Sequence, residues 1–148
     1  MTHYVLVGYD GTKRGRAAVS KAIDLAARER CDIVVVCTHE RPADFSNAPF
    51  LLGRLDESAW VREWEQQTQE DLRHEIMRIR LAGVDAVAEC SLDDPADLLH
   101  DLAEELDADY IVVPDDSKGV LADLIVGSMA QRLKRTSRIP VVVVRDDE

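Results

Sequence analysis

The sequence predicts a doubly wound, Rossmann-like α/β fold, in which a five-stranded parallel sheet carries helices on both faces. Short apolar segments alternate with longer amphipathic segments along the whole chain of 148 residues. Several of the short segments are continuous apolar runs, such as "YVLVGY" at Tyr4–Tyr9, which indicates strands that are buried on both faces. Because no linker or internal repeat interrupts this alternation, we expect a single domain over residues 1–148.

The first half of the chain predicts two strands and two helices. A turn at Asp10-Gly11-Thr12 follows the first strand, and the second strand is Asp32–Thr38. The helix between them is marked by apolar residues at helical spacing, namely Ala18, Val19, Ala22, Ile23 and Ala26. After a loop from Arg41, Asp56 can cap a long helix that ends near Gly83. The inner face of that helix is expected at Trp60, Trp64, Leu72, Ile76 and Ile79.

The second half predicts three more strands and two more helices. The strands are Val84–Cys90, Asp109–Pro114 and Pro140–Arg145. Between the first two, Asp94 is a helix N-cap and Pro95 takes the first helical position, where its missing N–H costs nothing. The inward residues of this helix are expected to be Leu98, Leu99, Leu102 and Leu106. The last helix opens at Gly127-Ser128, with Met129, Ala130 and Leu133 inward.

Composition narrows the class of protein. A net charge of −11 and a pI of about 4.7 argue against nonspecific binding of nucleic acid and against docking on anionic membranes. The three cysteines, Cys31, Cys37 and Cys90, show no metal-binding spacing, so we expect buried thiols in the cytoplasm. The N-terminal residues have no signal-peptide pattern, and no apolar run reaches the roughly 20 residues of a membrane helix.

A ligand in such a sheet binds beyond the carboxyl ends of the strands, where the strand order reverses. The loops that meet there are Asp10–Thr12, Thr38–Glu40 and Pro114–Gly119, together with Gly127-Ser128 at the start of the last helix. Free N–H groups and the dipole at a helix N-terminus favour an anion. A simpler interpretation is that Ser128 only caps its helix.

Three segments of the chain together resemble the universal stress protein family. They are "VLVGYDGT", "DDPADLLHDLAEELDADYIVVP" and "VGSMAQRLKRTSRIPVVVVR", which occur in the order and at the spacing of that family. The resemblance covers almost the whole chain and is weakest from Arg41 to about Arg78. It implies the adenine-nucleotide alpha hydrolase-like fold with strand order 3-2-1-4-5 and a homodimer. It also implies a nucleotide crevice, because many members bind ATP.

The phosphate loop of the ATP-binding members is altered in this chain. Their aspartate after the first strand matches Asp10, and the end of their motif G-x2-G-x9-G-[S/T] matches Gly127-Ser128. The first two motif glycines are replaced by Pro114 and Ser117. Proline removes an N–H donor, and the next residues, Asp115 and Asp116, would repel phosphate. If an anion site is retained, its residues are expected to be Asp10, Gly11, Thr12, Thr38, Pro114, Ser117, Gly127 and Ser128.

The sequence therefore favours a non-enzymatic stress-response or signalling protein that acts as a homodimer and binds ATP weakly or not at all. One alternative is an ATP-binding member in which Mg²⁺ bridges the phosphates and the Asp115/Asp116 pair. Another is a divalent-metal site formed by Asp10, His39, Asp115 and Asp116. The metal-site alternative has no supporting ligand spacing.

Other functional classes lack their residues. A phosphorelay receiver would need a lysine after the fifth strand, and the chain reads "DDE" there. No nucleophile elbow accompanies the histidines, and His3, His74 and His100 are expected to be solvated, at the terminus or on helix surfaces. The basic residues of the last helix complement its dipole and need no nucleic acid: they are Arg132, Lys134, Arg135 and Arg138.

The predicted partner surface is the fifth strand. In the family arrangement its four valines would form an apolar sheet edge, which is normally covered: Val141, Val142, Val143 and Val144. Pairing with a second copy of the chain through all four would cover this edge, and the alternative is burial under helices alone. The patch Phe50-Leu51-Leu52 is either a lid over the crevice or a second contact surface, for example for an unidentified protein partner.

Overall fold

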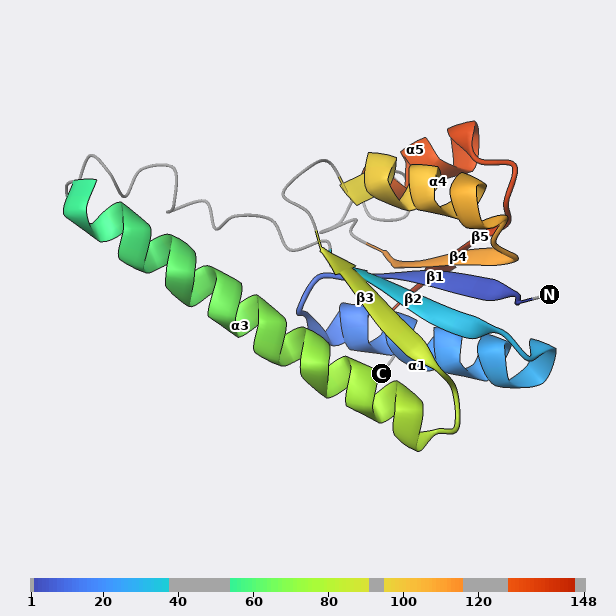
Figure 1. The fold of residues 1–148 in the computed structure, drawn as a ribbon. Coiled ribbons are helices and arrows are strands. Elements are labelled where there is room, and N and C mark those ends of the chain that lie inside the picture. Colours follow the sequence, from blue (N-terminus) through green and yellow to red (C-terminus); the bar gives the residue numbers. More distant parts are fainter. Residues whose placement is uncertain (1, 38–53, 91–94, 116–127, 146–148) are drawn as a thin grey trace.

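The computed structural model describes residues 2–37, 54–90, 95–115 and 128–145 (Figure 1). Its helices and strands, in chain order, are β1 (Tyr4–Tyr9), α1 (Lys13–Glu29), β2 (Asp32–Cys37), α3 (Arg54–Leu81), β3 (Ala86–Cys90), α4 (Pro95–Leu106), β4 (Tyr110–Pro114), α5 (Ser128–Thr136) and β5 (Val141–Val144). All strand pairs are parallel, and the sheet order is β3-β2-β1-β4-β5. The predicted doubly wound fold and strand order are confirmed.

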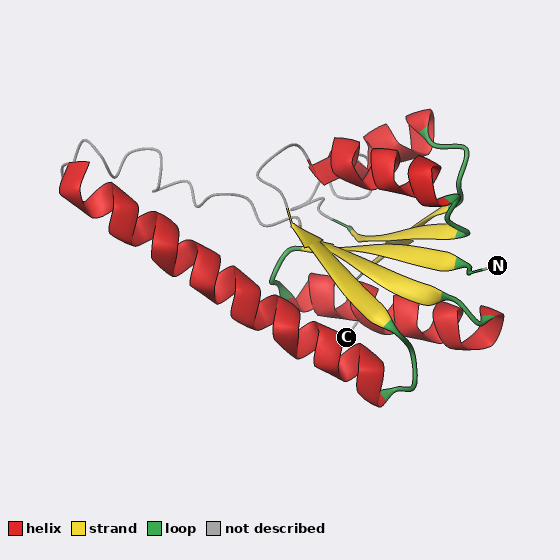
Figure 2. Cartoon of the chain, viewed as in Figure 1, coloured by secondary structure: helices red, strands yellow, loops and turns green. Residues whose placement is uncertain are grey.

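The sheet is the middle of three layers. Helices α1 and α3 cover one face, and α4 and α5 cover the other (Figure 2). Strand β1 lies at the centre, with Val5 opposite Ile33 of β2 on one side and opposite Tyr110 of β4 on the other. Strands β2 and β3 are added on one side of β1, and β4 and β5 on the other. The strand order therefore reverses beside β1.

The predicted strand boundaries agree with the structure to within two residues, and α4 starts at Pro95 as expected. The expected cap of the long helix is wrong, because α3 already begins at Arg54 and contains Asp56. An aspartate in the first turn still interacts favourably with the helix dipole, so the same residue type fits both positions. Gly83 follows the end of α3 with a φ of +86°, which explains a glycine there.

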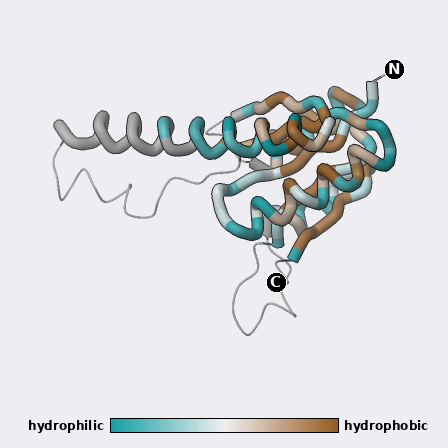
Figure 3. The backbone as a smooth tube through the Cα atoms, turned by 90° about the horizontal axis from the view of Figure 1, so that it is seen from below, coloured by the Kyte–Doolittle hydropathy of each residue, from teal (hydrophilic) through white to brown (hydrophobic). Residues whose placement is uncertain are grey.

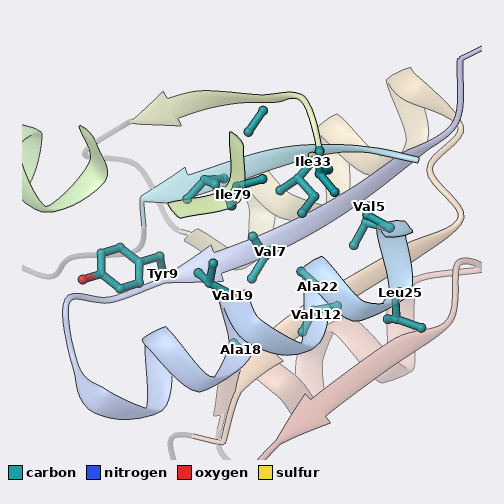
Figure 4. Close-up of a cluster of buried hydrophobic side chains, with 14 of the residues drawn as sticks. Val5, Val7, Tyr9, Ala18, Val19, Ala22, Leu25, Ile33, Ile79 and Val112 are labelled. Carbon is teal, nitrogen blue, oxygen red and sulfur yellow. The ribbon is translucent and has the colours of Figure 1, made fainter. Parts of the chain in front are cut away.

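Each face of the sheet has its own hydrophobic core. The core under α1 and α3 contains Val5, Val7, Val19, Ala22 and Ile79 (Figure 4). The core under α4 and α5 contains the strand residues whose side chains point to the other face of the sheet, together with residues of these helices. Its members include Leu6, Val34, Leu99, Ile111 and Leu133. Hydrophobic segments gather in the body of the domain, and α3 becomes hydrophilic where it leaves that body (Figure 3).

The valines of β5 contribute to both cores of their own chain. Val142 and Val144 pack against the core under α1 and α3, and Val141 and Val143 pack against the core under α4 and α5. All four side chains nevertheless remain only half-buried. The helices of this chain therefore cover the fifth strand only in part. This result lies between an apolar edge left for a second copy and complete burial under the helices.

Burial confirms one expectation about α4 and corrects another. The four leucines predicted inward all pack against the core, with Leu99 fully buried and Leu98, Leu102 and Leu106 half-buried. His100 was expected to be solvated, but it is half-buried and its Nδ1 atom has no solvent contact. The reason is that α5 lies alongside α4 and covers this side of it (Figure 1). His3 and His74 are exposed, as expected.

Cys31 and Cys37 are buried thiols that form no disulfide in the described part of the chain, in agreement with the predicted structural role. Burial, reinforced by the nearby Asp109 carboxylate, raises the pKa of the Cys31 thiol to about 11. This thiol is therefore protonated at neutral pH and is a poor nucleophile. No helix within the described ranges combines the length and apolar character needed to cross a membrane. The Phe50-Leu51-Leu52 patch and the side chains of Trp60 and Trp64 lie outside what the structure describes.

Candidate functional site

The carboxyl ends of β1 and β4 define the candidate site. These neighbouring strands lead to Asp10 and Asp115, and the N-terminus of α1 begins three residues after Asp10. Strand β1 continues into α1 on one face of the sheet, whereas β4 is followed by α5 on the other (Figure 2). This divergence is the topological switch point at which doubly wound folds bind their ligands.

The turn after β1 is closed by its own side chains. Asp10 Oδ1 accepts hydrogen bonds from the backbone N–H of Thr12, at 3.0 Å, and from the Thr12 hydroxyl. The same hydroxyl oxygen accepts from the Gly15 N–H at 3.1 Å, which caps α1. Gly11, at a φ of +81°, supplies the left-handed backbone that the turn requires. The predicted Asp10-Gly11-Thr12 turn is therefore a compact unit in which one Asp10 oxygen is already in use.

Gly15 lets the first turn of α1 approach the end of β1. A Cβ at this position would lie 2.5 Å from Asp10 Oδ1 and 3.0 Å from the Tyr9 ring. Both distances are below normal van der Waals contact, so a side chain would push Asp10 out of its hydrogen bonds with Thr12. The position of the Asp10 carboxylate therefore depends on the absence of a side chain one turn into α1.

Asp115, directly after β4, is anchored by three contacts with α1 and with the end of β5. Its N–H donates to the Val144 carbonyl at 2.9 Å, which continues the pairing with β5. Its carbonyl oxygen accepts from Arg14 Nη1 of α1, also at 2.9 Å. Its carboxylate lies 3.1 Å from Arg145 Nε, and only 11% of the side chain is exposed. The second residue of the altered phosphate loop is thus bonded both to α1 and to the end of β5.

This anchoring corrects the expected electrostatics. The sequence predicts that Asp115 repels phosphate, whereas its carboxylate forms an ion pair with Arg145, which reduces that repulsion. Arg14 lies at the same place, and Lys13 and Arg16 share the first turn of α1 with it. Neither Arg14 nor Arg145 was predicted as a site residue. The strand order 3-2-1-4-5 would have placed Arg145 beside the end of β4, because β5 is its neighbour.

Several predicted site residues are not placed. Thr38, His39, Asp116, Ser117 and Gly127 lie outside the described residues, and only the backbone of Ser128, the first residue of α5, is described. Their roles stay predictions. Within residues 2–37, 54–90, 95–115 and 128–145, no three His, Cys, Asp or Glu side chains group as a metal site. Since Asp115 pairs with Arg145 and Asp10 with Thr12, these two aspartates are poorly disposed to bind a metal.

Tyr9 connects the site to α3. Its side chain is buried beside Asp10, and burial raises its pKa, with further contributions from the Glu75 and Asp71 carboxylates of α3. A hydrogen bond with Arg16 acts in the opposite direction. Glu75 itself is only 4% exposed and forms an ion pair with Arg78, which reaches across to α1. Helix α3 therefore contributes charge next to Tyr9, the last residue of β1 before Asp10.

The parallel sheet between two helix layers, with its switch point beside β1, defines a doubly wound α/β protein. The family model described as the universal stress protein family matches residues 1–145, and the chain belongs to this family. The stress response protein NhaX of Bacillus subtilis is 25% identical over 160 residues, which cover 95% of this chain and 96% of that protein. A universal stress protein of Mycobacterium tuberculosis (strain H37Rv) is 30% identical over 142 residues, and the chain spans 45% of its length.

Solved structures show the same fold. A universal stress protein in complex with cAMP superimposes with a TM-score of 0.68 at 24% identity, covering 99% of this chain and 98% of that one. The universal stress protein from Archaeoglobus fulgidus in complex with dAMP gives a TM-score of 0.62 at 18% identity, with 97% and 98% covered. At these identities the likeness establishes the arrangement of helices and strands, and not the ligand.

Proposed function

We propose that this chain is a cytoplasmic, single-domain, non-enzymatic stress-response protein that acts as a homodimer and binds ATP weakly or not at all. The observation that carries the nucleotide part is the start of the phosphate loop. Pro114 has no N–H, and the N–H of Asp115 already donates to Val144. Phosphates in such crevices are bound largely by free backbone N–H groups. The first two positions of this loop offer none.

Family membership supports the stress-response part of the proposal, and the buried thiols Cys31 and Cys37 suit a reducing cytoplasm. The relatives solved with cAMP and dAMP indicate that a crevice of this fold can hold an adenine nucleotide. In this chain Asp10 occupies the position after β1 that the ATP-binding members share, but one of its oxygens is engaged with Thr12. We therefore propose that the nucleotide site of the family is retained in this chain and that its affinity for phosphate is reduced.

The ion pair of Asp115 with Arg145 favours a second candidate, an ATP-binding protein that uses Mg²⁺. A compensated Asp115 repels phosphate less than a free carboxylate, and Arg14 adds a cation near the loop. In this candidate Asp116, outside the described residues, would share Mg²⁺ with the phosphates. The two candidates differ by their affinity for ATP and by the effect of Mg²⁺ on it.

Calorimetric titration of the purified protein with ATP, with and without Mg²⁺, separates these candidates. We expect no saturation below about 1 mM ATP, which corresponds to a binding free energy weaker than about −4 kcal/mol. The double variant Pro114→Gly/Ser117→Gly is expected to gain at least about tenfold in affinity, because it restores an N–H donor and backbone freedom. Pro140→Gly, a proline before β5 and outside the predicted loop, serves as the control and should gain nothing. A micromolar dissociation constant for the native protein with Mg²⁺ would instead establish the second candidate.

The dimer part of the proposal rests on the edge strand β5. Its four valines are only half-buried, whereas β2 and β4 are almost wholly buried. The carbonyls of Pro140 and Val144 both accept hydrogen bonds from β4. Since backbone groups alternate along a strand, those of Val141 and Val143 point to the open side of the sheet. An antiparallel β5 of a second copy can bind to this row of groups.

The same alternation divides the predicted interface residues into two kinds. Val142 lies opposite Val112 of β4, and its backbone groups, like those of Val144, are directed at β4 and not at a partner. The sequence predicts dimerisation through the whole strand, Val141 to Val144, and the alternation assigns a different contact to each pair of valines. Their half-buried side chains can still contact a second copy. The proposed backbone contact is therefore limited to Val141 and Val143.

Replacing Val143 by proline is expected to produce a monomer. The substitution removes an outward N–H and places a ring at the sheet edge, while the hydrogen bonds from β4 to Pro140 and Val144 remain. Val143→Ala is the matched control, because it shortens the same side chain but retains the N–H. Sedimentation velocity should give twice the chain mass for the native protein and the control, and one chain mass for Val143→Pro. A native protein that sediments as a monomer would refute the dimer.

A further inference from the structure

A cavity of about 270 Å³ lies between α4 and α5, in the helix layer on the opposite face of the sheet from α1 and α3. Its lining residues come from both helices: Ala96, Asp97 and His100 of α4, and Arg132, Leu133, Arg135 and Thr136 of α5. None of them belongs to the candidate nucleotide site. The cavity is therefore a separate feature of the fold, and its chemistry needs its own explanation.

Two ion pairs connect α4 with α5 and with the segment that follows α5. Asp97 of α4 lies 2.9 Å from Arg132 Nη2, and Glu104 lies 3.2 Å from Arg138 Nη2. His100 sits on α4 between these two acidic residues and contributes to the cavity wall. One ion pair thus joins α4 to α5, and the other joins α4 to Arg138, two residues beyond the end of α5. The cavity lies within the packing of the two helices.

Two polar groups of the cavity have no partner within the described chain. The His100 Nδ1 atom is buried, and it neither accepts nor donates a hydrogen bond within the described residues. Arg135 lines the cavity, and no ion pair or hydrogen bond of its guanidinium occurs among the described residues. A buried imidazole nitrogen without a partner costs about 1–3 kcal/mol, so the fold tolerates a group that a ligand could satisfy.

The charge of the lining selects the kind of ligand. Two arginines and one aspartate line the cavity, which leaves one net positive charge in a chain whose total is −11. Because Asp97 is occupied by Arg132, the guanidinium of Arg135 carries this excess. A guanidinium prefers oxyanions such as phosphate and carboxylate, which it binds through two parallel hydrogen bonds.

We propose that the cavity between α4 and α5 binds a small oxyanion through Arg135 and His100. The imidazole of His100 donates an N–H to the anion. Rotation of the ring by 180° about the Cβ–Cγ bond keeps the ring in the same space and moves Nδ1 to the opposite edge of the ring. The cavity is smaller than the 300–1,000 Å³ typical of sites for drug-sized ligands. It therefore fits inorganic phosphate, a single phosphoryl group or a short carboxylate, and not a whole nucleotide.

The test follows the imidazole nitrogens by long-range ¹H–¹⁵N NMR while inorganic phosphate is added to the full-length protein. Sodium chloride keeps the ionic strength constant, so that general screening does not change during the titration. We expect the His100 signals to shift and saturate with a dissociation constant of about 1 mM or tighter, a modest affinity for one small anion. His74, exposed on α3, should not shift.

Neighbouring cations of α5 provide the matched variants. Arg135→Ala removes a lining cation and is expected to weaken binding at least about tenfold. Lys134→Ala removes the adjacent positive charge, which does not line the cavity, and should change the dissociation constant less than about twofold. Circular dichroism of both variants verifies that α5 remains folded. Equal losses in the two variants would show nonspecific attraction to a basic helix and would overturn the proposal.

Succinate at the same ionic strength distinguishes the source of the oxyanion. Tighter binding of phosphate assigns the cavity to phosphoryl groups, and tighter binding of succinate assigns it to carboxylates; both support an oxyanion site. Failure of both anions to shift His100 at about 20 mM, well above the expected dissociation constant, would overturn it. His100→Gln, which retains a donor of similar reach, should bind more tightly than His100→Ala if the imidazole contacts the anion.

Discussion

Replacing Leu99 by alanine is expected to lower the free energy of unfolding by about 3 kcal/mol, within the range of 2–5 kcal/mol for buried leucines. Leu99 lies on the inner face of α4 and is fully buried. It packs in the core beneath α4 and α5, which also contains Leu6, Ile111 and Leu133. Truncation removes buried apolar area and leaves a cavity that the rigid sheet cannot fill.

Urea unfolding at a fixed protein concentration measures the effect, because the stability of a dimer depends on concentration. Leu98→Ala is the control on the adjacent position. Leu98 is half-buried against the same core, so its truncation should cost roughly half as much or less. Similar losses for the two variants would mean that α4 is rotated relative to the sheet and that Leu99 is not its main anchor.

The leucines of α4 show what periodicity can and cannot predict. The spacing of Leu98, Leu99, Leu102 and Leu106 correctly indicates an apolar stripe, but only Leu99 is fully buried. Burial at the margin of a stripe depends on the neighbouring helix. On one margin α5 covers His100, a residue that was expected in solvent. The position of α5 next to α4 follows from the strand order, and the strand order cannot be predicted from the hydrophobic periodicity of α4.

The strands were easier to predict than the site. Tyr4–Tyr9 was predicted with its observed bounds, because a continuous apolar run ends abruptly at Asp10-Gly11. The state of Asp115 was not predicted. Its carboxylate is paired with Arg145, thirty positions later in the chain, through the β4–β5 register. The sequence from Asp93 to Asp116 contains no Lys or Arg, whereas the fold brings Arg14 and Arg145 to Asp115 from the two ends of the chain.

The same limitation applies to Glu75. A glutamate in a long charged helix predicts a solvated side chain, yet Glu75 is 4% exposed. Its burial is possible because Arg78 lies one turn further on and because α1 provides acceptors for the same guanidinium. Both conditions concern the packing of α3 on α1. They are invisible in the hydrophobic pattern of either helix.

Arg78→Ala is expected to lower the free energy of unfolding by about 2–3 kcal/mol. Its Nε and Nη2 donate to Glu75 Oε1 at 3.2 and 2.6 Å, and its Nη1 donates to the Ser20 hydroxyl at 2.8 Å. Nη2 also donates to the Arg16 carbonyl at 2.9 Å, so one side chain joins α3 to α1. Removing a partner of a buried charge typically costs 3–5 kcal/mol. The expected loss is smaller here, because 38% of the Arg78 side chain is exposed.

Arg73→Ala on the same helix is the control for this prediction, since Arg73 is exposed and should change stability by less than about 0.5 kcal/mol. Adding Glu75→Gln to Arg78→Ala should recover part of the loss, because a buried amide costs less than a buried carboxylate without its cation. Urea unfolding of the four proteins gives the comparison. If Arg78→Ala is no less stable than Arg73→Ala, the ion pair does not hold α3 on α1. The position of Glu75 behind Tyr9 and the crevice would then depend on apolar packing around Leu72 and Ile79.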